Sequence, residues 1–286
     1  MRSWLFIPGD SEKKLAKAAT SPADIIIFDL EDSVAEARKP VARDMVREAI
    51  ANVPGRAAVR INPLTSGLAD DDLAGVMAAG PDIIVLPKSE RGADVADLSV
   101  RLAVLEAQHG LDDGATKIMA IATETAPALF GLGSYGGASQ RLTGMAWGAE
   151  DLSTVLGAVR TRDAAGEWTH TFQLARTLCL AGAVAAGVQP IDTIYADFRD
   201  AEGFAADCAA AAADGFLGKM AIHPAQVEPI NAAFTPTDAA IAEAQAIVDA
   251  FAAAPDAGTI GLDGRMIDRP HLVKAEALLA RAKAYI

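Results

Sequence analysis

The chain has 286 residues, of which 51% are hydrophobic and 22% charged, and its 38 acidic and 25 basic side chains give a formal net charge of −13. A chain this apolar can bury a large core, which excludes an intrinsically disordered protein. The acidic balance argues against non-specific binding to nucleic acid or to an anionic membrane, because both need surplus positive charge.

Short β-rich segments recur eight times, each closed by a polar or turn residue and followed by a helix-like segment. Several are apolar at consecutive positions, as in residues 25–28, which is typical of strands buried on both faces of a parallel sheet. Eight strand–helix units predict a (β/α)8 TIM barrel. The predicted strands are Trp4–Ile7, Ile25–Leu30, Ala57–Ile61, Ile83–Leu86, Ile118–Ala122, Leu142–Trp147, Ile191–Ala196 and Lys219–Ile222.

Helix-like segments follow the strands and continue beyond the last one. We expect a catalytic barrel domain over residues 1–228 and a C-terminal helical extension over residues 229–286, which packs on the barrel or on a neighbouring subunit. The extension shows no strand pattern, only a Pro/Gly-marked loop between its two helices. The predicted helices include Glu12–Ala19, Pro40–Ala51, Val95–Gln108, Gln173–Ala186, Asp238–Ala253 and Arg269–Ala284.

The first apolar segment, residues 4–7, is followed by Pro8-Gly9 and is too short for the core of a signal peptide. No segment approaches the roughly 18 uninterrupted apolar residues of a membrane span. We therefore expect a cytoplasmic protein with neither a membrane nor a nucleic-acid partner.

Charged side chains follow almost every predicted strand. In a (β/α)8 barrel the carboxyl ends of the strands meet at one rim, and that rim carries the active site. Random surface polarity would also place polar residues there, so the set is more informative than any single member. Its members are Asp29, Glu31, Asp32, Arg60, Lys88, Glu124, Glu150, Asp151, Asp197 and His223.

Carboxylates without a cluster of Cys or His predict a hard cation. Mg²⁺ takes oxygen ligands, usually one or two carboxylates together with water and substrate oxygens. Glu124 and Asp151 follow adjacent strands and are the predicted ligand pair; the alternative is that each caps a helix. The acidic group of Asp29, Glu31 and Asp32 needs a nearby cation or arginine, unless it forms a capped loop.

Arg60 follows an apolar strand and would carry its guanidinium into the barrel mouth. A guanidinium buried there needs an anionic partner, which is either the substrate or a structural carboxylate such as Asp29 or Glu31. His223 is open to two interpretations, an acid–base group or a structural residue before Pro224.

The motifs resemble, in order and over nearly the whole chain, those of the citrate lyase β-subunit-like family, which includes malyl-CoA and citramalyl-CoA lyases of the HpcH/HpaI aldolase superfamily. The matching stretches are residues 2–9 (RSWLFIPG), 28–34 (FDLEDSV), 59–63 (VRINP), 86–88 (LPK), 122–125 (ATET), 147–151 (WGAED), 195–200 (YADFRD), 218–224 (GKMAIHP) and 264–270 (GRMIDRP).

This resemblance implies a Mg²⁺-dependent carbon–carbon lyase, with Mn²⁺ as a substitute, that cleaves a (3S)-citramalyl-CoA or malyl-CoA type thioester reversibly to acetyl-CoA and pyruvate or glyoxylate. It implies that Glu124 and Asp151 hold the metal and that Arg60 acts at the reacting oxygen. It implies that Asp29, Glu31 and Asp32 contact these groups and hold them in place, and do not bind the metal themselves. It assigns substrate binding to Phe6, Lys17, Arg60, Glu124, Glu150, Asp151, Ile222 and His223.

The resemblance also implies that Asp268, in the extension, is an acid–base carboxylate that reaches the active site of a neighbouring subunit. The protein is then a homo-oligomer, a trimer or a multiple of three. The alternative for Asp268 is a helix N-cap, since Asp-x-Pro is an ordinary helix start.

Three other functions stay open. A citrate lyase β subunit, acting on citryl-ACP, would depend on an acyl-carrier partner. A non-catalytic acyl-CoA-binding homologue would bind without turnover, although the complete set of Arg60, Glu124, Asp151 and Asp268 argues against it. A barrel glycosidase also uses two carboxylates, but 5% aromatic residues offer few platforms for sugar.

Overall fold

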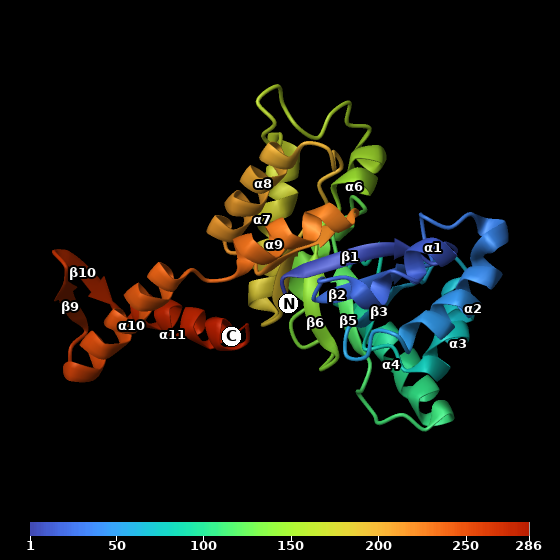
Figure 1. Cartoon of the computed structure of the whole chain (residues 1–286), viewed down its shortest axis with the longest axis horizontal. Coiled ribbons are helices and arrows are strands. Elements are labelled where there is room, and N and C mark those ends of the chain that lie inside the picture. Colours follow the sequence, from blue (N-terminus) through green and yellow to red (C-terminus); the bar gives the residue numbers. More distant parts are fainter. Residues whose placement is uncertain (286) are drawn as a thin grey trace. The chain divides into compact units, whose positions relative to one another are not determined.

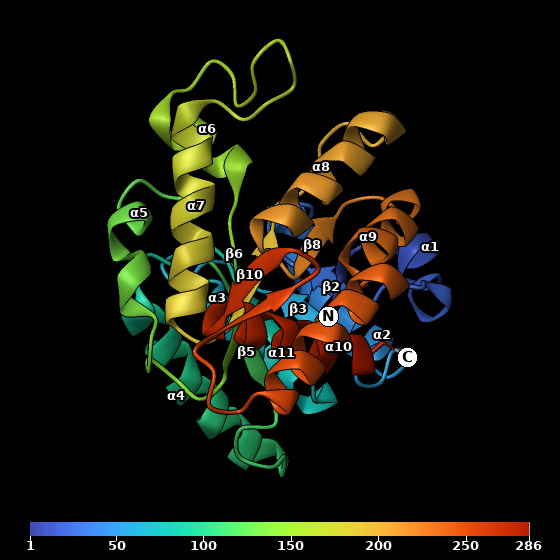
Figure 2. The same ribbon diagram turned by 90° about the vertical axis from the view of Figure 1, so that its left-hand side faces the viewer.

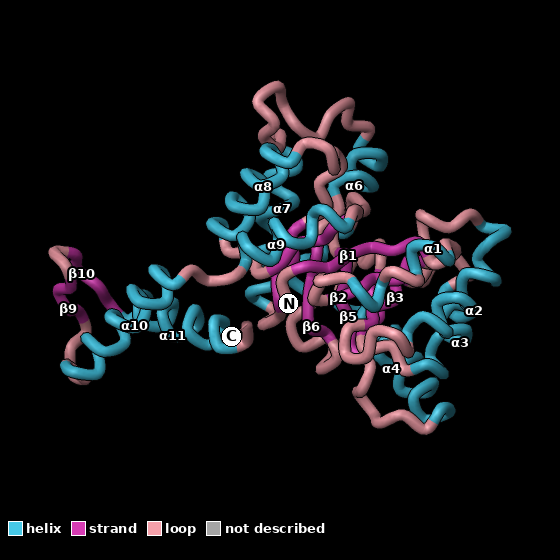
Figure 3. The backbone as a smooth tube through the Cα atoms, in the orientation of Figure 1, coloured by secondary structure: helices cyan, strands magenta, loops and turns pink. Residues whose placement is uncertain are grey.

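Eight parallel strands, hydrogen-bonded in chain order, close into a barrel in the computed structural model, which describes residues 1–285 (Figures 1 and 3). Each strand is followed by helical segments, so the predicted (β/α)8 barrel is confirmed. The strands are β1 Ser3–Pro8, β2 Ile25–Asp29, β3 Ala57–Arg60, β4 Ile83–Leu86, β5 Lys117–Ile121, β6 Leu142–Ala146, β7 Gln189–Asp192 and β8 Gly218–Ala221.

The consecutive apolar positions of the strands fill both sides of the barrel wall. In β2 every residue is buried. Ile25 and Ile27 belong to the core inside the barrel, so Ile26 and Phe28, which alternate with them, face the surrounding helices. Side chains from all eight strands fill the interior, as expected of a barrel of this size. They include Trp4, Ala58, Ile83, Val85, Met119, Ile121, Ala146, Ile191 and Met220.

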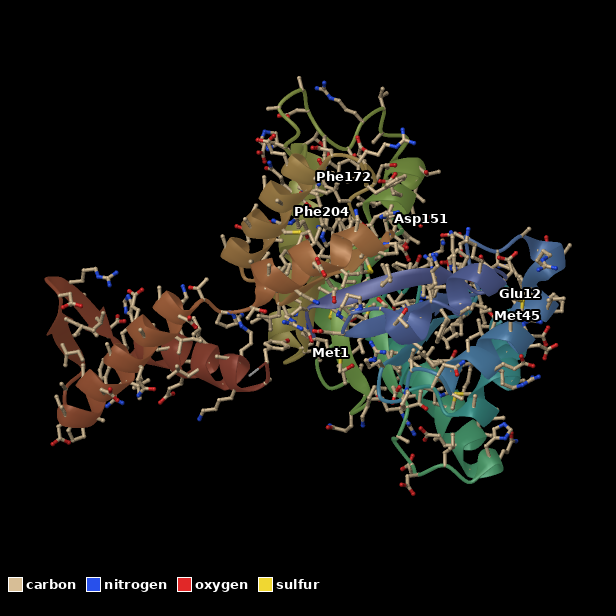
Figure 4. The ribbon with its side chains drawn as sticks, viewed as in Figure 1. Met1, Glu12, Met45, Asp151, Phe172 and Phe204 are labelled. Atoms are coloured by element: carbon tan, nitrogen blue, oxygen red, sulfur yellow. The ribbon has the colours of Figure 1, made fainter. Side chains whose placement is uncertain are left out.

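Helices surround these strands, and Figure 3 shows the helices outside and the strands within. Phe172 of α7 and Phe204 of α8, both labelled in Figure 4, are buried side chains of this outer layer. No helix within residues 1–285 is long and apolar enough to cross a membrane. The helices of this part are α1 Glu12–Leu15, α2 Lys39–Ile50, α3 Ala69–Val76, α4 Gly92–His109, α5 Ala128–Gly131, α6 Ala149–Leu156, α7 His170–Ala185, α8 Ala201–Asp214 and α9 Val227–Phe234.

The seventh strand lies earlier than its sequence predicts. We expect Ile191–Ala196, whereas β7 spans Gln189–Asp192. The strand ends where Asp192 pairs in register with Lys219 of β8 and accepts a hydrogen bond from its ammonium. Asp197 therefore does not end a strand but lies exposed in the following loop.

The chain divides into two compact units, Met1–Asn231 and the residues from Ala232 onward. In the second unit α10 (Asp238–Ala253) packs against α11 (Arg269–Lys283). Between them β9 (Thr259–Leu262) and β10 (Arg265–Asp268) form an antiparallel hairpin, visible near α10 in Figure 2. The two predicted helices of the extension are present, whereas the prediction of a loop without strands between them is wrong. Asp263 and Gly264 form the hairpin turn with φ of 50° and 76°, a conformation that Asp-Gly favours.

Candidate active site at the barrel mouth

A cavity of about 400 Å³ lies at the carboxyl ends of the strands, entirely within the first unit. It brings together eight of the residues that the sequence singles out: Phe6, Asp29, Asp32, Arg60, Glu124, Glu150, Asp151 and Ile222. Its other lining residues are Pro8, Lys14, Ser33, Ile121, Gly148, Ala149, Thr193, Ile194 and Met220.

Arg60, at the end of β3, is held by the end of β2. Its Nε and Nη2 each donate to one carboxylate oxygen of Asp29, at 2.7 Å. The guanidinium carbon lies 4.8 Å from the centre of the Phe6 ring. Burial disfavours the charged form of Asp29, but the Arg60 guanidinium outweighs it and holds the pKa of this carboxyl below its usual value. The ion pair of Arg60 with a structural carboxylate, which the sequence predicts as the alternative, is therefore present. The guanidinium keeps further N–H groups that do not bind Asp29.

Glu31 lies between two cations of the mouth. Its Oε2 is 2.9 Å from Arg60 Nη1, and its Oε1 accepts a hydrogen bond from Lys88 Nζ. Burial nevertheless raises the pKa of Glu31, because both cations together do not offset its loss of hydration. Asp32, next in the chain, is exposed and stands 3.6 Å from Arg60 Nη1.

A buried lysine anchors the loop that carries these acids. Lys39 Nζ donates to the carbonyl oxygens of Leu30 and Glu31 at 2.7 and 2.9 Å, and to Asn62 Oδ1 at 2.8 Å. Asn62 in turn donates to Leu30 O and to Asp72. The backbone under Glu31 is therefore fixed by hydrogen bonds from α2 and from the segment after β3.

Glu124 follows β5 and is almost fully buried, with 3% of its surface exposed. Its Oε2 accepts the backbone N–H of Lys88 at 2.6 Å. Gly148 passes so close that a Cβ there would lie 2.7 Å from Glu124 Cγ, which only glycine permits. Burial, and next the charge of Glu31, raise the pKa of Glu124 to about 8. This carboxylate is therefore short of positive charge.

Asp151 stands in the first turn of α6 and is labelled in Figure 4. Its Oδ1 lies 3.6 Å from Lys88 Nζ, and its charge also raises the pKa of Glu124. Two oxygen donors on one cavity, one of them buried without enough positive charge, fit a hard divalent cation. Within the described residues no group of three or more His, Cys, Asp or Glu side chains could hold a metal ion.

Two predicted contacts of the acyl-CoA lie off the cavity wall. Lys17 is exposed beyond α1, and Lys14 of the same segment lines the cavity instead. His223 Nδ1 accepts the N–H of Ala225 at 3.2 Å, and its ring stacks on Phe198 at 4.9 Å. These contacts match the structural interpretation of His223; its role toward a substrate stays a prediction.

Asp268 belongs to the second unit. It is the N-cap residue of α11, as its sequence context predicts, and its N–H donates to His271 Nδ1 at 3.2 Å. Its side chain also contacts the His271 ring. Its proposed acid–base role remains an expectation.

Sequence reasoning misses the apolar wall of the cavity, formed by Ile121, Ile194 and Met220. Ile121 and Met220 could have been predicted, because both occupy inward-facing positions near the carboxyl ends of their strands. Thr193 and Ile194 were missed because the sequence places both inside the seventh strand, whereas both residues follow the end of β7. The several contacts of Lys88 have no sequence signal, because they depend on its backbone conformation.

Comparisons with known proteins show which family the sequence matches and which solved structures it is similar to. The family model described as HpcH/HpaI aldolase/citrate lyase matches residues 2–224. The chain is 36% identical over 290 residues to the citrate lyase subunit beta of Haemophilus influenzae, covering 100% of this chain and 98% of that protein. It is 35% identical over 294 residues to a (3S)-malyl-CoA thioesterase of Cereibacter sphaeroides, covering 99% and 95% of the two chains. The crystal structure of CitE from Mycobacterium tuberculosis in complex with magnesium, acetoacetate and coenzyme A superimposes with a TM-score of 0.80 at 33% identity, over 99% and 98% of the two chains.

Proposed function

This chain belongs to the HpcH/HpaI aldolase/citrate lyase family, as its motifs predict, and on that premise we propose that it is a Mg²⁺-dependent carbon–carbon lyase acting on an acyl-CoA. The substrate is a 3-hydroxy-3-carboxyacyl-CoA of the (3S)-citramalyl-CoA or malyl-CoA type, and the products are acetyl-CoA and pyruvate or glyoxylate. The observation that carries the proposal is the convergence of Glu124, Asp151 and the Arg60 guanidinium on one cavity.

Glu124 and Asp151 would hold the divalent ion, Mg²⁺ with Mn²⁺ as a substitute. The fit rests on the donor set: two carboxylates line the cavity, and the buried one has a pKa raised to about 8, which a neighbouring cation would lower. When bound, the ion supplies Lewis-acid polarisation of the hydroxy-acid oxygens. The related CitE structure holds magnesium together with acetoacetate, which supports the same assignment here.

The protein's own groups serve the oxygen whose charge changes during cleavage. A base, or solvent water, takes the proton of the 3-hydroxyl, whose oxygen becomes the keto oxygen. The bond from the hydroxyl-bearing carbon to the thioester α-carbon then breaks. The bonding electron pair stays on the α-carbon as the acetyl-CoA enolate, which takes up one proton. Arg60 donates to the changing oxygen, and Asp29 fixes its orientation before the substrate arrives. The backbone N–H groups around Gly148–Asp151, including that of Glu150, would hold the acid's carboxylate.

Asp268 would supply the proton to the enolate carbon, or remove it in the condensation direction. We assign this role to Asp268 of a neighbouring copy of the chain in a homo-oligomer, a trimer or a multiple of three. Support comes from the match of residues 264–270 to the family motif. Support also comes from the position of Asp268 in a unit separate from the barrel.

The wall of the cavity favours a small 2-oxo acid. Ile121, Ile194 and Met220 offer apolar surface, which suits the methyl group of pyruvate or the hydrogen of glyoxylate. Oxaloacetate would bring a second carboxylate against that wall, where burial without a cation is costly. The positive charge of Arg60 is already balanced by Asp29 and Glu31, although N–H groups of its guanidinium remain free of both carboxylates. This argues against citryl-ACP as substrate, although the full-length similarity to citrate lyase beta subunits keeps that function as the alternative.

The acyl-CoA end would lie over β1 and β8, at Phe6 and Ile222. Lys14, which lines the cavity, would meet the negative charge of the CoA arm, with Lys17 and His223 farther out. Local positive charge of this kind is needed because the chain as a whole carries −13.

Mass spectrometry of the purified protein incubated with Mg²⁺, acetyl-CoA and either pyruvate or glyoxylate tests the proposal. We expect the corresponding citramalyl-CoA or malyl-CoA, or its free acid if hydrolysis follows, and none of them after chelation. Acetyl-CoA binding without product would favour a non-catalytic acyl-CoA-binding homologue. Turnover that requires an acyl-carrier protein would favour a citrate lyase β subunit.

A further inference from the structure

Lys88, directly after β4, has a backbone conformation that lysine rarely adopts. Its φ is 51°, and among residues 1–285 the only other non-glycine residue with positive φ is Asp263 in the β9–β10 turn. A non-glycine residue costs about 1 kcal/mol in this region, and unlike Asp, lysine has no short side chain to bond its own backbone. Such a conformation is retained where the surrounding contacts require it.

The contacts of Lys88 join three strand ends of the active site. Its backbone N–H donates to Glu124 at 2.6 Å, so the left-handed turn serves one predicted metal ligand. Its Nζ contacts Glu31 and lies 3.6 Å from Asp151, the other predicted ligand. Asp32 stands 3.9 Å away. The side chain is 27% exposed, so its ammonium is not sealed in the core.

The charges around this ammonium pose a conflict for the proposed reaction. Carboxylates crowd the mouth, and the charge of Arg60, a second cation among them, is offset by Asp29 and Glu31. Such a field attracts a divalent cation but repels an anionic 2-oxo acid, and the same site has to accept both. The ammonium of Lys88 lies where it reduces the negative field at Asp151 and Glu31.

We propose that Lys88 is a positioning residue that balances the affinity of this site for its two ligands, and this inference rests on the function proposed above. The backbone of Lys88 holds Glu124 in place. Its ammonium weakens the grip of the carboxylates on the divalent cation and lowers the repulsion that the anionic 2-oxo acid meets. Removal of the charge therefore tightens metal binding and weakens binding of the acid.

Calorimetric titration with Mn²⁺ and Mg²⁺ of the wild type, Lys88→Gly and Lys88→Arg tests the inference. Glycine keeps the left-handed backbone and its N–H but removes the charge, whereas arginine keeps the charge. We expect Lys88→Gly to bind the cation about tenfold more tightly, the change expected when one unit charge near a divalent ion is removed from a partly solvated site. Its KM for the 2-oxo acid should rise, and Lys88→Arg should keep the wild-type metal affinity.

Unchanged or weaker metal binding by a folded Lys88→Gly would overturn the inference, since a merely structural lysine would loosen the ligands when it is removed. Thermal melting of all three proteins shows whether each is folded. If Lys88→Gly does not fold, Lys88→Met is titrated in its place under the same expectation. A wild type that binds neither cation would refute the proposed function itself, whereas a wild type that binds and a Lys88→Gly variant that binds identically would refute only the role of Lys88.

Discussion

The two carboxylate oxygens of Asp29 each accept a hydrogen bond from the guanidinium of Arg60, at 2.7 Å. Two parallel bonds fix the plane of the guanidinium, which a single bond would not. Arg60 therefore presents its remaining N–H groups to the cavity in one orientation before any substrate binds. Groups arranged in this way act on developing charge without a cost of reorganisation.

Arg60→Lys should reduce kcat/KM for thioester cleavage by about 100-fold or more, because a lysine keeps the charge but not the fork that donates to the reacting oxygen. Steady-state kinetics measure this, with the exposed Arg47→Lys of α2 as the matched control. Metal affinity should stay close to that of the wild type. A folded Arg60→Lys enzyme with normal kcat/KM would remove Arg60 from the chemistry.

Lys14→Ala should raise the KM for the acyl-CoA more than Lys17→Ala does, because Lys14 lines the cavity and Lys17 is exposed beyond it. The wild-type KM should also rise with ionic strength, and this dependence should weaken in Lys14→Ala. Initial rates at several salt concentrations give both quantities. A larger rise in the KM of Lys17→Ala than in that of Lys14→Ala would show that Lys17, the residue that the family resemblance indicates, binds the acyl-CoA.

The barrel and its rim were predictable because both follow from local pattern. Consecutive apolar residues such as 25–28 identify strands buried on both faces, and the charged residues at or after the ends of β2, β3, β5 and β6 line the cavity. Arg60, Glu124 and Asp151 were reached in this way. These three residues line one cavity because the sheet closes into a barrel.

Features that depend on partners distant in the sequence were not predictable. β7 ends at Asp192, which pairs with Lys219 of β8, and no local signal in the sequence marks this end. The left-handed backbone of Lys88 is stabilised by Glu124, a residue 36 positions away. The β9–β10 hairpin is different, because Asp263-Gly264 is a recognisable turn signal that the helical interpretation of the extension overlooked.

Asp192→Asn should destabilise the barrel by about 3 kcal/mol, because it removes the carboxylate of β7 that pairs with the fully buried ammonium of Lys219 and leaves that ammonium with Asp207 alone. Asp214→Asn, which removes an exposed partner of Arg176, should cost about 1 kcal/mol or less. Urea unfolding of the three proteins measures the free energies. Equal losses in the two variants would contradict the account of how β7 and β8 are joined.

The cost of Asp192→Asn should also depend on pH. Burial disfavours the charged carboxyl, but the Lys219 ammonium outweighs it and holds the pKa of Asp192 below its ordinary value of 3.8. The ion pair therefore stabilises the fold fully above about pH 3.8 and loses this effect as the pH falls through the lower pKa of the folded state. The difference in unfolding free energy between the wild type and Asp192→Asn should be constant from pH 7 to pH 5 and shrink toward pH 3. A difference in unfolding free energy between the two proteins that grew as the pH fell would contradict this account.

Asp268→Asn should lose most of its turnover while keeping metal affinity, if this carboxylate moves the proton at the enolate carbon. Co-expression with Glu124→Gln should then restore activity in mixed oligomers, because one copy supplies an intact cavity and another supplies Asp268. Activity of the purified mixed species, compared with each variant alone, measures this. Near-normal turnover of Asp268→Asn would leave this residue only its observed position as the N-cap of α11.

Calorimetric titration of Mg²⁺ into the wild type, Glu124→Gln and the exposed Glu48→Gln, with cleavage of malyl-CoA and citramalyl-CoA followed on the same samples, tests the central claim most directly. We expect one binding site in the wild type and in Glu48→Gln. In Glu124→Gln the affinity should fall by about 100-fold, since even outer-shell partners of a metal are worth 10–100-fold, and cleavage should fall with it. Wild-type affinity in Glu124→Gln, or cleavage that survives removal of all divalent ions, would contradict the account.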